Sequence, residues 1–280
     1  MVLTLWGTRG SLATPGPATA RYGGNTSCVG VRGDDGTVLV LDAGTGIRGL
    51  GKTVDASVRR VNILLTHLHM DHIQGLGFFA PLFREDLEVR IFGPVSSHAG
   101  LRERLMRYLS PPLFPVSLRE LPCTITLHEV PCGEFDIGEF RVTSALVCHP
   151  GPTVGYRIAD GNGKVLTYLP DHEPALGAST FPSLPREWTS GGSLAAEADL
   201  LIHDSQYRAD EYQRHVGWGH SSLTQALDFA ALVDARHFVS FHHDPGHTDA
   251  DIDRQMEEAL AEAKPAFRVT AGLEGSSFAL

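Results

Sequence analysis

The sequence is poor in lysine and lacks both a basic track and a long apolar run. Lysine occurs only at Lys52, Lys164 and Lys264, and acidic residues outnumber basic ones by 33 to 23, for a net charge of −10. Such a chain has little long-range attraction for polyanions, so long nucleic acid is a disfavoured partner. No segment approaches the ~18 apolar residues of a membrane span, and the start "MVLTLWGTRGS" lacks the features of a signal peptide. We therefore expect a cytoplasmic protein without membrane contacts.

Cysteine is also scarce. The four cysteines form no CxxC pair, which disfavours both a disulfide framework and a cysteine-based zinc site. Reduced, partly buried thiols are the expected state of Cys28, Cys123, Cys132 and Cys148.

Short apolar segments bounded by glycine and proline indicate two successive series of strands, each followed by helical periodicity. The expected strands are 2–5, 27–31, 37–41 and 61–65, then 124–130, 140–147, 153–158 and 164–169, and finally 200–203 and 238–242. The expected helices are 73–83, 96–109 (capped by Ser96 or Ser97), 221–232 and 250–263. This order predicts two sheets packed face to face with helices outside, in a single domain over residues 1–280. The proline-rich segment "LSPPLFPVSL" (109–118) predicts a loop or lid, within a lid-like insertion around 96–120.

The segment "THLHMDH" (66–72) follows the apolar strand 61–65 and holds four candidate metal ligands: His67, His69, Asp71 and His72. Histidines two residues apart in an extended segment project to the same side, and the last two residues fall on the turn into a helix. Imidazole and carboxylate ligands suit zinc, manganese or iron. The segment therefore predicts a metal site, with one pair of ligands for each of two adjacent ions.

Further ligand candidates stand at the ends of later strands. His149, Asp171 and His242 each follow a predicted strand, and a site is commonly assembled at the carboxyl ends of strands. His243 is an alternative to His242, since the two are adjacent.

These segments together resemble the metallo-β-lactamase superfamily, over nearly the whole chain. The resemblance is carried by "VLDAGTGI", "THLHMDH", "CHPGPTVGYRI", "TYLPDHE" and "SFHHDP". It implies an α/β, four-layer αββα sandwich, a non-ligand orienting role for Asp42, and two metal sites that share one carboxylate. The implied ligands are His67, His69 and His149 for one ion, Asp71, His72 and His242 for the other, and Asp171 as the bridge.

Two further segments resemble the ribonuclease Z and small-molecule phosphodiesterase branch. "ADLLIHDSQY" (198–207) and "GWGHSSLTQALDFA" (217–230) match the region before the last ligand strand, with His220 in the position that stands beside the scissile phosphate. The opening "WGTRGS…RYGGNTSCV" resembles that branch's N-terminal hairpin. We expect a dinuclear phosphodiesterase, with two divalent cations (zinc favoured, manganese or iron as alternatives) that hold a bridging hydroxide for attack on phosphorus. The expected catalytic residues are His220, Asp71 and Asp171.

Several alternatives remain open at this point. A thioesterase or lactonase shares the ligand set, and a sensor with degenerate catalysis would also bind metal. A tRNA 3′-processing endonuclease is less favoured, because the family's tRNA-gripping arm lies between the third histidine motif and the bridging aspartate. Only 21 residues separate His149 from Asp171. We therefore expect a small cyclic nucleotide or another small phosphodiester as substrate, and the resemblance implies a possible homodimer.

Supporting roles are also open for several residues around the expected centre. The pair His203 and Asp204 is either a support for His220 or a strand end with buried polar partners, the second being preferred. Ser221 or Ser222 caps a helix in the structural alternative for the His220 motif. Contacts to phosphate are conceivable for three arginines, although structural roles are commoner: Arg9, Arg21 and Arg157.

Overall fold

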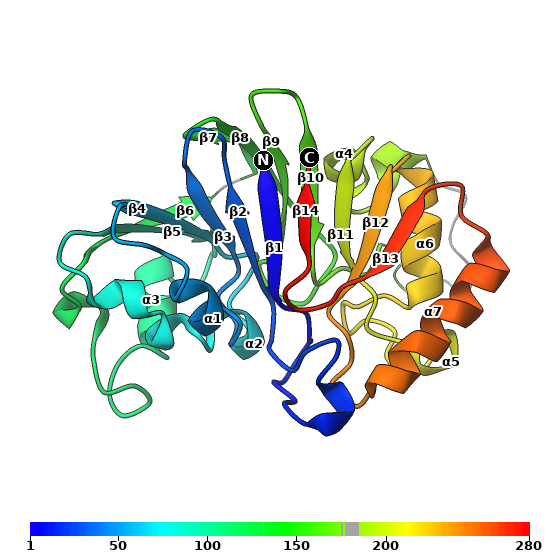
Figure 1. Cartoon of the computed structure of the whole chain (residues 1–280), viewed down its shortest axis with the longest axis horizontal. Helices are drawn as coiled ribbons and strands as arrows, with labels where there is room; N and C mark the ends of the chain where they lie inside the picture. Colours follow the sequence, from blue (N-terminus) through cyan, green and yellow to red (C-terminus); the bar gives the residue numbers. More distant parts are fainter. Residues whose placement is uncertain (131, 175, 177–184) are drawn as a thin grey trace.

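The computed structural model describes residues 1–130, 132–174, 176 and 185–280, and within these ranges two seven-stranded sheets lie face to face (Figure 1). The first sheet has the order β14–β1–β2–β3–β4–β5–β6, and the second has the order β13–β12–β11–β10–β9–β8–β7. The strands of the first sheet are β1 (Val2–Gly7), β2 (Cys28–Arg32), β3 (Val38–Leu41), β4 (Arg60–Leu64), β5 (Glu88–Pro94), β6 (Thr124–Val130) and β14 (Ser277–Ala279). Those of the second are β7 (Gly133–Ile137), β8 (Phe140–Leu146), β9 (Val154–Ala159), β10 (Val165–Leu169), β11 (Leu200–Asp204), β12 (His237–Phe241) and β13 (Arg268–Ala271).

Each sheet contains a parallel part that directs strand ends to one edge of the molecule. β3 to β6 pair in parallel in the first sheet, and β10 to β13 pair in parallel in the second. The carboxyl ends of parallel strands meet at one edge of a sheet, where polar residues from several strands can converge. This edge is where the predicted metal ligands follow β4, β10 and β12.

Three apolar layers hold the sandwich together. The middle layer joins the two sheets and includes Leu3, Leu41, Tyr168 and Phe241. One outer layer packs helices on the first sheet, and the other packs helices on the second sheet. The predicted αββα sandwich is therefore confirmed.

Short helices cover the first sheet and longer ones cover the second, on opposite sides of the molecule (Figure 1). The helices are α1 (Ile47–Gly51), α2 (Met70–Ile73), α3 (Leu101–Met106), α4 (Gly192–Ala195), α5 (Ala209–Tyr212), α6 (Leu223–Leu232) and α7 (Asp249–Ala263). Short 3-10 turns add η1 (Pro17–Thr19), η2 (Leu76–Phe78), η3 (Ala80–Phe83), η4 (Leu118–Glu120) and η5 (Arg186–Trp188). In the part of the chain that the structure describes, we find no helix with the length and apolar character needed to cross a membrane.

Two of the predicted helices are wrong in extent. The segment 73–83 is not one helix: α2 ends at Ile73 and two separate 3-10 turns follow, because Gly75, Gly77 and Pro81 interrupt regular hydrogen bonding. Neither Ser96 nor Ser97 caps α3, which begins after Gly100. A side chain from the neighbouring β6 takes the capping role, since Glu129 Oε1 accepts a hydrogen bond from Leu101 N at 2.9 Å.

Sequence reasoning also missed four strands: β5, β7, β13 and β14. Their apolar residues alternate with polar or charged ones, as in "EVRIFGP" and "GEFDI", or the strands have only three or four residues, so they lack the continuous apolar segments of most of the predicted strands. Their pairing with neighbouring strands stabilises them and cannot be read from local pattern.

The proline-rich segment is a loop, as its sequence predicts, and three of its apolar side chains pack inward, whereas Leu113 is exposed. Leu109, Phe114 and Leu118 are buried in the layer between the helices and the first sheet. The ring of Phe114 meets the exposed Phe78 edge to face, with centroids 5.8 Å apart. Its role as a lid stays a prediction.

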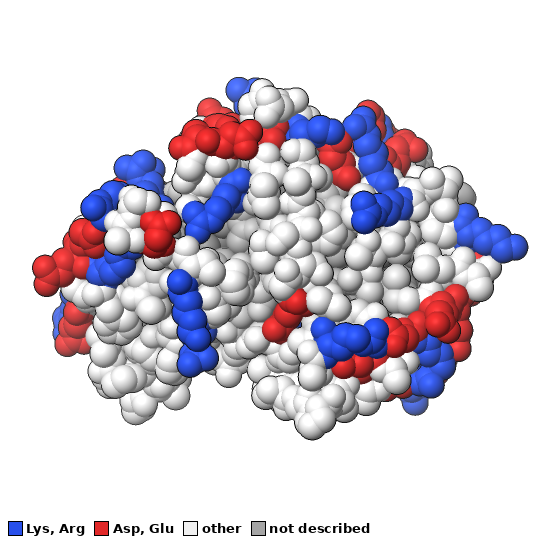
Figure 2. Space-filling model, in the orientation of Figure 1, with Lys and Arg blue, Asp and Glu red and all other residues white. Residues whose placement is uncertain are grey.

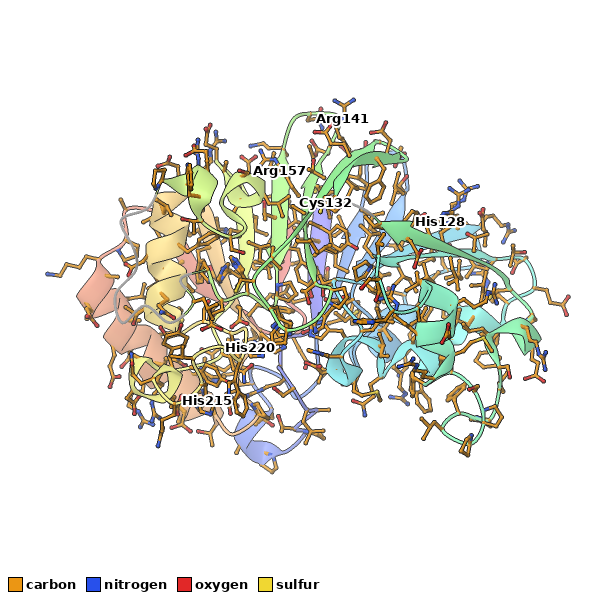
Figure 3. The ribbon with its side chains drawn as sticks, turned by 180° about the vertical axis from the view of Figure 1, so that it is seen from behind. His128, Cys132, Arg141, Arg157, His215 and His220 are labelled. Atoms are coloured by element: carbon orange, nitrogen blue, oxygen red, sulfur yellow. The ribbon has the colours of Figure 1, made fainter. Side chains whose placement is uncertain are left out.

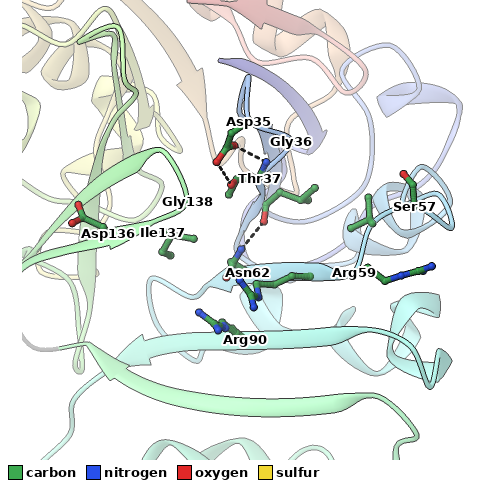
Figure 4. A pocket seen from close by; sticks show the side chains of 13 residues that line it. Asp35, Gly36, Thr37, Ser57, Arg59, Asn62, Arg90, Asp136, Ile137 and Gly138 are labelled. Atoms are coloured by element: carbon green, nitrogen blue, oxygen red, sulfur yellow. Dashed lines mark hydrogen bonds between the residues drawn. The ribbon is translucent and has the colours of Figure 1, made fainter.

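A crevice of about 410 Å³ lies at the opposite end of β3 and β4 from the predicted ligands. It is bounded by the β2–β3 turn, the starts of β4 and β5, and the β7–β8 hairpin, with Asn62 and Arg90 among its lining residues (Figure 4). None of the predicted site residues lines it. On the face shown in Figure 2, basic side chains alternate with acidic ones around the periphery and form no continuous track.

Candidate metal centre

The predicted ligands from the histidine-rich segment lie together at the strand-to-helix junction after β4. His67 precedes the junction, His69 is the residue before the first turn of α2, and Asp71 and His72 lie within that turn. His67 and His72 are buried, whereas His69 is exposed at the mouth of the site.

The structure brings all seven predicted ligands into two adjoining groups. Within each group, one potential ligand atom per residue lies within 4.8 Å of the others. The first group is His67, His69 and His149, and the second is Asp71, His72, Asp171 and His242. Asp171 lies between them, since its Oδ2 is 3.7 Å from Nε2 of both His67 and His149 while its Oδ1 is 2.9 Å from His72 Nε2.

Asp42 orients the histidine-rich segment that follows β4. It follows β3 in the left-handed region (φ +58°), a conformation that aspartate adopts more readily than most residues. Its carboxylate accepts hydrogen bonds from Thr66 N at 2.8 Å, His72 Nδ1 at 2.8 Å and Tyr168 OH at 3.0 Å. One fully buried carboxylate therefore orders the segment that carries four ligand candidates.

Four of the histidines use Nδ1 in a hydrogen bond directed away from the cluster. The partners are Thr66 Oγ1 for His67, Asp42 Oδ2 for His72, the Gly219 carbonyl for His149 and Gln206 Oε1 for His242. A carbonyl or carboxylate partner requires the proton on Nδ1, which leaves the lone pair of Nε2 facing inward. This is the orientation that metal-ligating histidines have when an outer partner fixes the ring.

Some inward-facing atoms of the cluster are buried without a hydrogen bond of acceptable geometry in the described structure. They include His67 Nε2, His72 Nε2 and Asp171 Oδ1. Unpaired buried polar atoms are costly, and their convergence from separate strands fits coordination of a cation. The residues present therefore fit divalent metal.

The electrostatics agree with a site that binds cations. Burial would raise the pKa of Asp171, but His242, His72 and His67 hold that pKa well below its usual range. Burial also lowers the pKa of His67 well below its usual value, so that ring is neutral. A neutral imidazole beside an ionised carboxylate is the protonation state that metal binding requires.

Asp71 has an unexpected partner in the loop between β1 and β2. Its Oδ2 accepts a hydrogen bond from Ser11 N at 2.8 Å and lies 3.1 Å from His242 Nε2. The neighbouring Gly10 passes so close that a Cβ there would lie 2.3 Å from His242 Nδ1. The N-terminal loop is therefore part of the wall of the site, and no local pattern announces this backbone contact.

The two adjacent histidines after β12 point in different directions. His242 adopts φ +61° and turns its ring into the cluster. His243 is buried beneath, and its Nε2 donates to the Gly272 carbonyl at 2.9 Å. Only His242 is in place to reach a metal.

His220, labelled in Figure 3, contacts a histidine of each group. Its ring stacks on His242 with centroids 4.9 Å apart and meets His149 edge to face at 5.0 Å. Its Nδ1 is 2.6 Å from Asp204 Oδ2 and 3.9 Å from Asp171 Oδ2. Burial would lower the pKa of His220, but the charge and hydrogen bond of Asp204, followed by Asp171 and Asp71, raise the pKa to about 9. Cations bound nearby would oppose this increase.

Asp204 hydrogen-bonds to His220, whereas His203 does not. Both residues are buried at the end of β11, which agrees with the alternative of a strand end with buried polar partners. Asp204 also accepts hydrogen bonds from Gln206 N and Ser221 N. His203 points away to His172, with its Nε2 2.9 Å from His172 Nδ1. Ser222 does cap α6, because its hydroxyl accepts from Gln225 N, so the structural alternative for the serines is true alongside the placement of His220.

Glu173 is a buried carboxylate that sequence reasoning missed. It accepts hydrogen bonds from Tyr212 OH at 2.7 Å, Gly217 N at 2.9 Å and Gly219 N at 2.8 Å. Gly219 must be glycine, because its φ is +85° and a Cβ would lie 2.3 Å from His149 Nδ1. Glu173 thus holds the loop that orients His149 and carries His220, and only its place two residues after Asp171 could have drawn attention to it.

The three arginines considered for phosphate contacts hold other parts of the protein. Arg9 is fully buried and donates to backbone carbonyls of residues 23, 244 and 247. Arg157 donates to the carbonyls of Leu194 and Ala196, and Arg21 pairs with Asp253. The four cysteines form no disulfide, and two of them are buried.

The fold and the site define a hydrolase of the αββα type with a histidine- and carboxylate-rich centre for divalent metal. The family described as "Beta-lactamase superfamily domain" matches residues 37–243, more than half of the chain. The chain belongs to this superfamily, as its motifs predict, and it is a metal-dependent hydrolase.

A protein named Ribonuclease Z from Brevibacillus brevis is 26% identical over 96% of this chain and 93% of its own length. Among solved structures, the metallo-β-lactamase fold protein YhfI from Bacillus subtilis superposes with a TM-score of 0.70 at 19% identity, covering 99% of this chain and 98% of that one. A diphosphatase from the PhnP family superposes with a TM-score of 0.69 at 18% identity, covering 100% and 97%. At these identities the two structures show a shared fold alone, whereas the curated relative supports the ribonuclease Z-like branch.

Proposed function

We propose that this protein is a dinuclear metal-dependent phosphodiesterase that acts on a small phosphodiester. His67, His69 and His149 would hold the first cation, Asp71, His72 and His242 would hold the second, and Asp171, which lies between the two groups, would serve both. The observation that carries the proposal is the position of His220, which is paired with Asp204, stacks on His242 of one group and meets His149 of the other edge to face. A phosphate bound at the centre would lie beside this imidazole.

When bound, the cations supply Lewis-acid stabilisation of phosphoryl charge and activate water as the nucleophile. His72, His149 and His242 keep Nε2 directed inward through their outer hydrogen bonds, so little reorganisation is needed when metal enters. Asp171 contributes negative charge to both groups and so favours two cations at close range. The wall formed by residues 10–11 and the loop 217–219 limits the access of bulk water.

His220 holds a proton that the leaving group requires. Its Nδ1 is fixed by Asp204, so Nε2 carries the second proton of the imidazolium and can donate it to a departing alkoxide. General acid catalysis of this kind contributes ~10²–10⁴-fold to the rate. The same N–H can first donate a hydrogen bond to a phosphoryl oxygen and position it.

A small substrate is supported by the segment between His149 and Asp171. The described chain there forms only the antiparallel hairpin of β9 and β10, joined by the turn at residues 160–164. An arm that grips tRNA has no place in this hairpin. The net charge of −10 also opposes binding of a long polyanion.

Zinc is the cation we propose, with manganese or iron as alternatives, because five imidazoles and two carboxylates suit borderline metals. A homodimer and a cytoplasmic location stay predictions.

The test combines metal analysis with a substrate panel on the purified full-length protein. We expect two metal equivalents per chain and turnover of bis-aryl phosphodiesters or 2′,3′- or 3′,5′-cyclic nucleotides. His220→Ala should reduce turnover of the cyclic nucleotides, whose leaving group is an alkoxide, by ~10²–10⁴-fold without loss of metal. His128→Ala is the matched control, because His128 lies on the edge strand β6 far from His220 (Figure 3). An intact His220→Ala rate would contradict the assigned role.

The same panel separates the alternatives. Turnover of thioesters or lactones, unaffected by His220→Ala, would favour an acyl hydrolase. Cleavage of precursor tRNA 3′ ends is the second candidate function, because the Brevibacillus relative is named Ribonuclease Z. Absence of turnover with every phosphodiester, tRNA included, would refute the proposal, and two bound metals without any turnover would favour a sensor.

A further inference from the structure

Three large apolar side chains are more than half exposed on segments that border the metal centre. Leu12 is 58% exposed and follows Ser11, whose amide bonds Asp71. Met70 is 52% exposed between two ligand candidates, and Trp218 is 61% exposed beside Gly219. We refer to Leu12, Met70 and Trp218 as the apolar rim.

Trp218 stands on a firmly held loop. The amides of the glycines on either side of it, Gly217 and Gly219, both donate to the buried carboxylate of Glu173. The carbonyl of Gly219 in turn accepts from His149 Nδ1. The backbone that carries Trp218 is therefore fixed relative to a proposed metal ligand.

The indole ring is also supported from one side by other rings. His215 meets it edge to face, with centroids 4.9 Å apart. His215 stacks on Tyr207 at 4.5 Å, and Tyr207 contacts the ring of His220 at 6.0 Å. His215 and His220 lie on the same side of the molecule, in the region after β11 (Figure 3). An aromatic series thus leads from the proposed proton donor to Trp218, whose outer surface stays open.

An exposed indole on a rigid loop has a large apolar surface that the fold itself does not use. A phosphate group interacts with cations and with His220, so the apolar rim offers it nothing. The organic part of a phosphodiester, by contrast, must lie next to the phosphate and can cover this rim. Aromatic rings stack on indole with favourable offset or edge contacts.

We propose that Trp218 is a specificity-determining residue that stacks against an aromatic non-leaving ester group of the substrate, of the size of a nucleobase, while Leu12 and Met70 border the same group. This inference rests on the proposed phosphodiesterase function and narrows its substrates to nucleotide-like diesters. Base-to-aromatic stacking is worth ~1–3 kcal/mol per base by alanine substitution, which corresponds to about a 5- to 150-fold change in kcat/KM.

The experiment compares two substrates with the same leaving group. Thymidine 5′-(p-nitrophenyl phosphate) carries a base, and methyl p-nitrophenyl phosphate does not. For Trp218→Ala we expect kcat/KM to fall about 5- to 150-fold with the thymidine substrate, mainly through KM, and less than twofold with the methyl substrate. Trp218→Phe should retain most of the preference, whereas Trp218→Leu, apolar but not aromatic, should lose it.

Binding provides a second readout that needs no turnover. Thymidine 5′-monophosphate should quench tryptophan fluorescence of the metal-loaded protein, and the quenching should vanish in Trp218→Phe, which keeps Trp6 and Trp188. Equal losses of kcat/KM on both substrates would show that Trp218 only maintains the loop and would overturn the inference, as would quenching that persists in Trp218→Phe. If the wild type cleaves neither diester, the proposed function fails, and Trp218-dependent nucleotide binding alone then decides the inference.

Discussion

The two halves of the chain build their shares of the metal centre in different ways. In the first half, one carboxylate, Asp42, orders a continuous segment through Thr66 and His72. In the second half, the ligand candidates come singly from the ends of separate strands. Two carboxylates there, Asp204 and Glu173, hold His220 and the loop beside His149. Ligand candidates in one continuous segment can be oriented by a single residue, whereas ligand candidates on separate loops need an orienting residue for each loop.

The two orienting carboxylates Asp42 and Glu173 differ in how many ligand groups they reach. Asp42 reaches His72 of one group directly and His67 of the other through Thr66. Near the ligand candidates, Glu173 bonds the loop beside His149 and His220, and its other side-chain partner, Tyr212, belongs to α5. Loss of Asp42 should therefore affect both cations, and loss of Glu173 should affect mainly one.

We expect the largest effect on metal content and activity from replacement of Asp171, which lies between the two ligand groups. Asp171→Asn removes the charge shared by the two groups, so we expect fewer than two metal equivalents and a loss of activity of ~10³-fold or more, since metal ions supply several kcal/mol of transition-state stabilisation. Elemental analysis and kcat/KM measure this. Asp228→Asn, at an exposed carboxylate on α6, should match the wild type, and two full equivalents in Asp171→Asn would refute the bridging role.

The adjacent histidines after β12 test the second half residue by residue. We expect His242→Gln to lose the cation held by Asp71 and His72, because its inward Nε2 disappears. His243→Gln should keep both equivalents, since the His243 ring points away from the cluster and donates to the Gly272 carbonyl. Metal analysis with thermal denaturation separates ligand loss from misfolding, and a metal loss in His243→Gln alone would reverse the assignment.

Asp42→Asn and Glu173→Gln compare the two orienting carboxylates directly. An amide offers one acceptor oxygen, and its NH2 group opposes the donors around it. For Asp42→Asn we expect ~10–100-fold weaker metal binding in both groups, as for other residues that orient ligands. For Glu173→Gln we expect weaker binding only in the group of His149, with a stability loss of ~1–3 kcal/mol. Competition with a zinc chelator measures each group, and equal patterns in the two variants would contradict the comparison.

The smallest effect concerns pH and His203. Burial lowers the pKa of His203 to about 4, below the ordinary value near 6.5, so the folded protein keeps this ring neutral. Its contribution to stability is complete above pH ~6.5 and declines as the pH falls toward 4, because the unfolded chain binds the proton first. Between pH 7 and pH 5 this amounts to about 2 kcal/mol. Denaturant unfolding should show a smaller pH dependence for His203→Gln, and identical slopes would disprove the burial effect.

The residues of the site that stand in one continuous segment were easier to predict from the sequence than those on separate strands and loops. The ligands at positions 67–72 stand in one short segment, so their spacing alone indicates a metal site. His149, Asp171 and His242 could be proposed because each ends a predicted strand, and the structure places all three at the expected edge. The amide of Ser11, the side chain of Gln206 and the carboxylate of Glu173 could not be proposed, because each contact joins positions far apart in the chain.

The fold shows a similar pattern. Strands that are nearly continuous apolar segments, such as β3, β4 and β10, are predicted within a residue or two of their ends. β5 and β7 are not predicted, because their apolar residues alternate with charged ones and form no continuous segment. The helix expected at 73–83 is wrong because glycine and proline outweigh its apolar spacing.

The sequence by itself determined the residue types of the centre, the segment that holds half of them, and the class of fold, since these depend on local composition and spacing. Only the tertiary structure decided which of His242 and His243 faces inward, which partner fixes each imidazole, and that Trp218 stands exposed beside the centre. Those outcomes depend on backbone direction and on contacts between strands and loops that are remote in sequence, which no local pattern encodes.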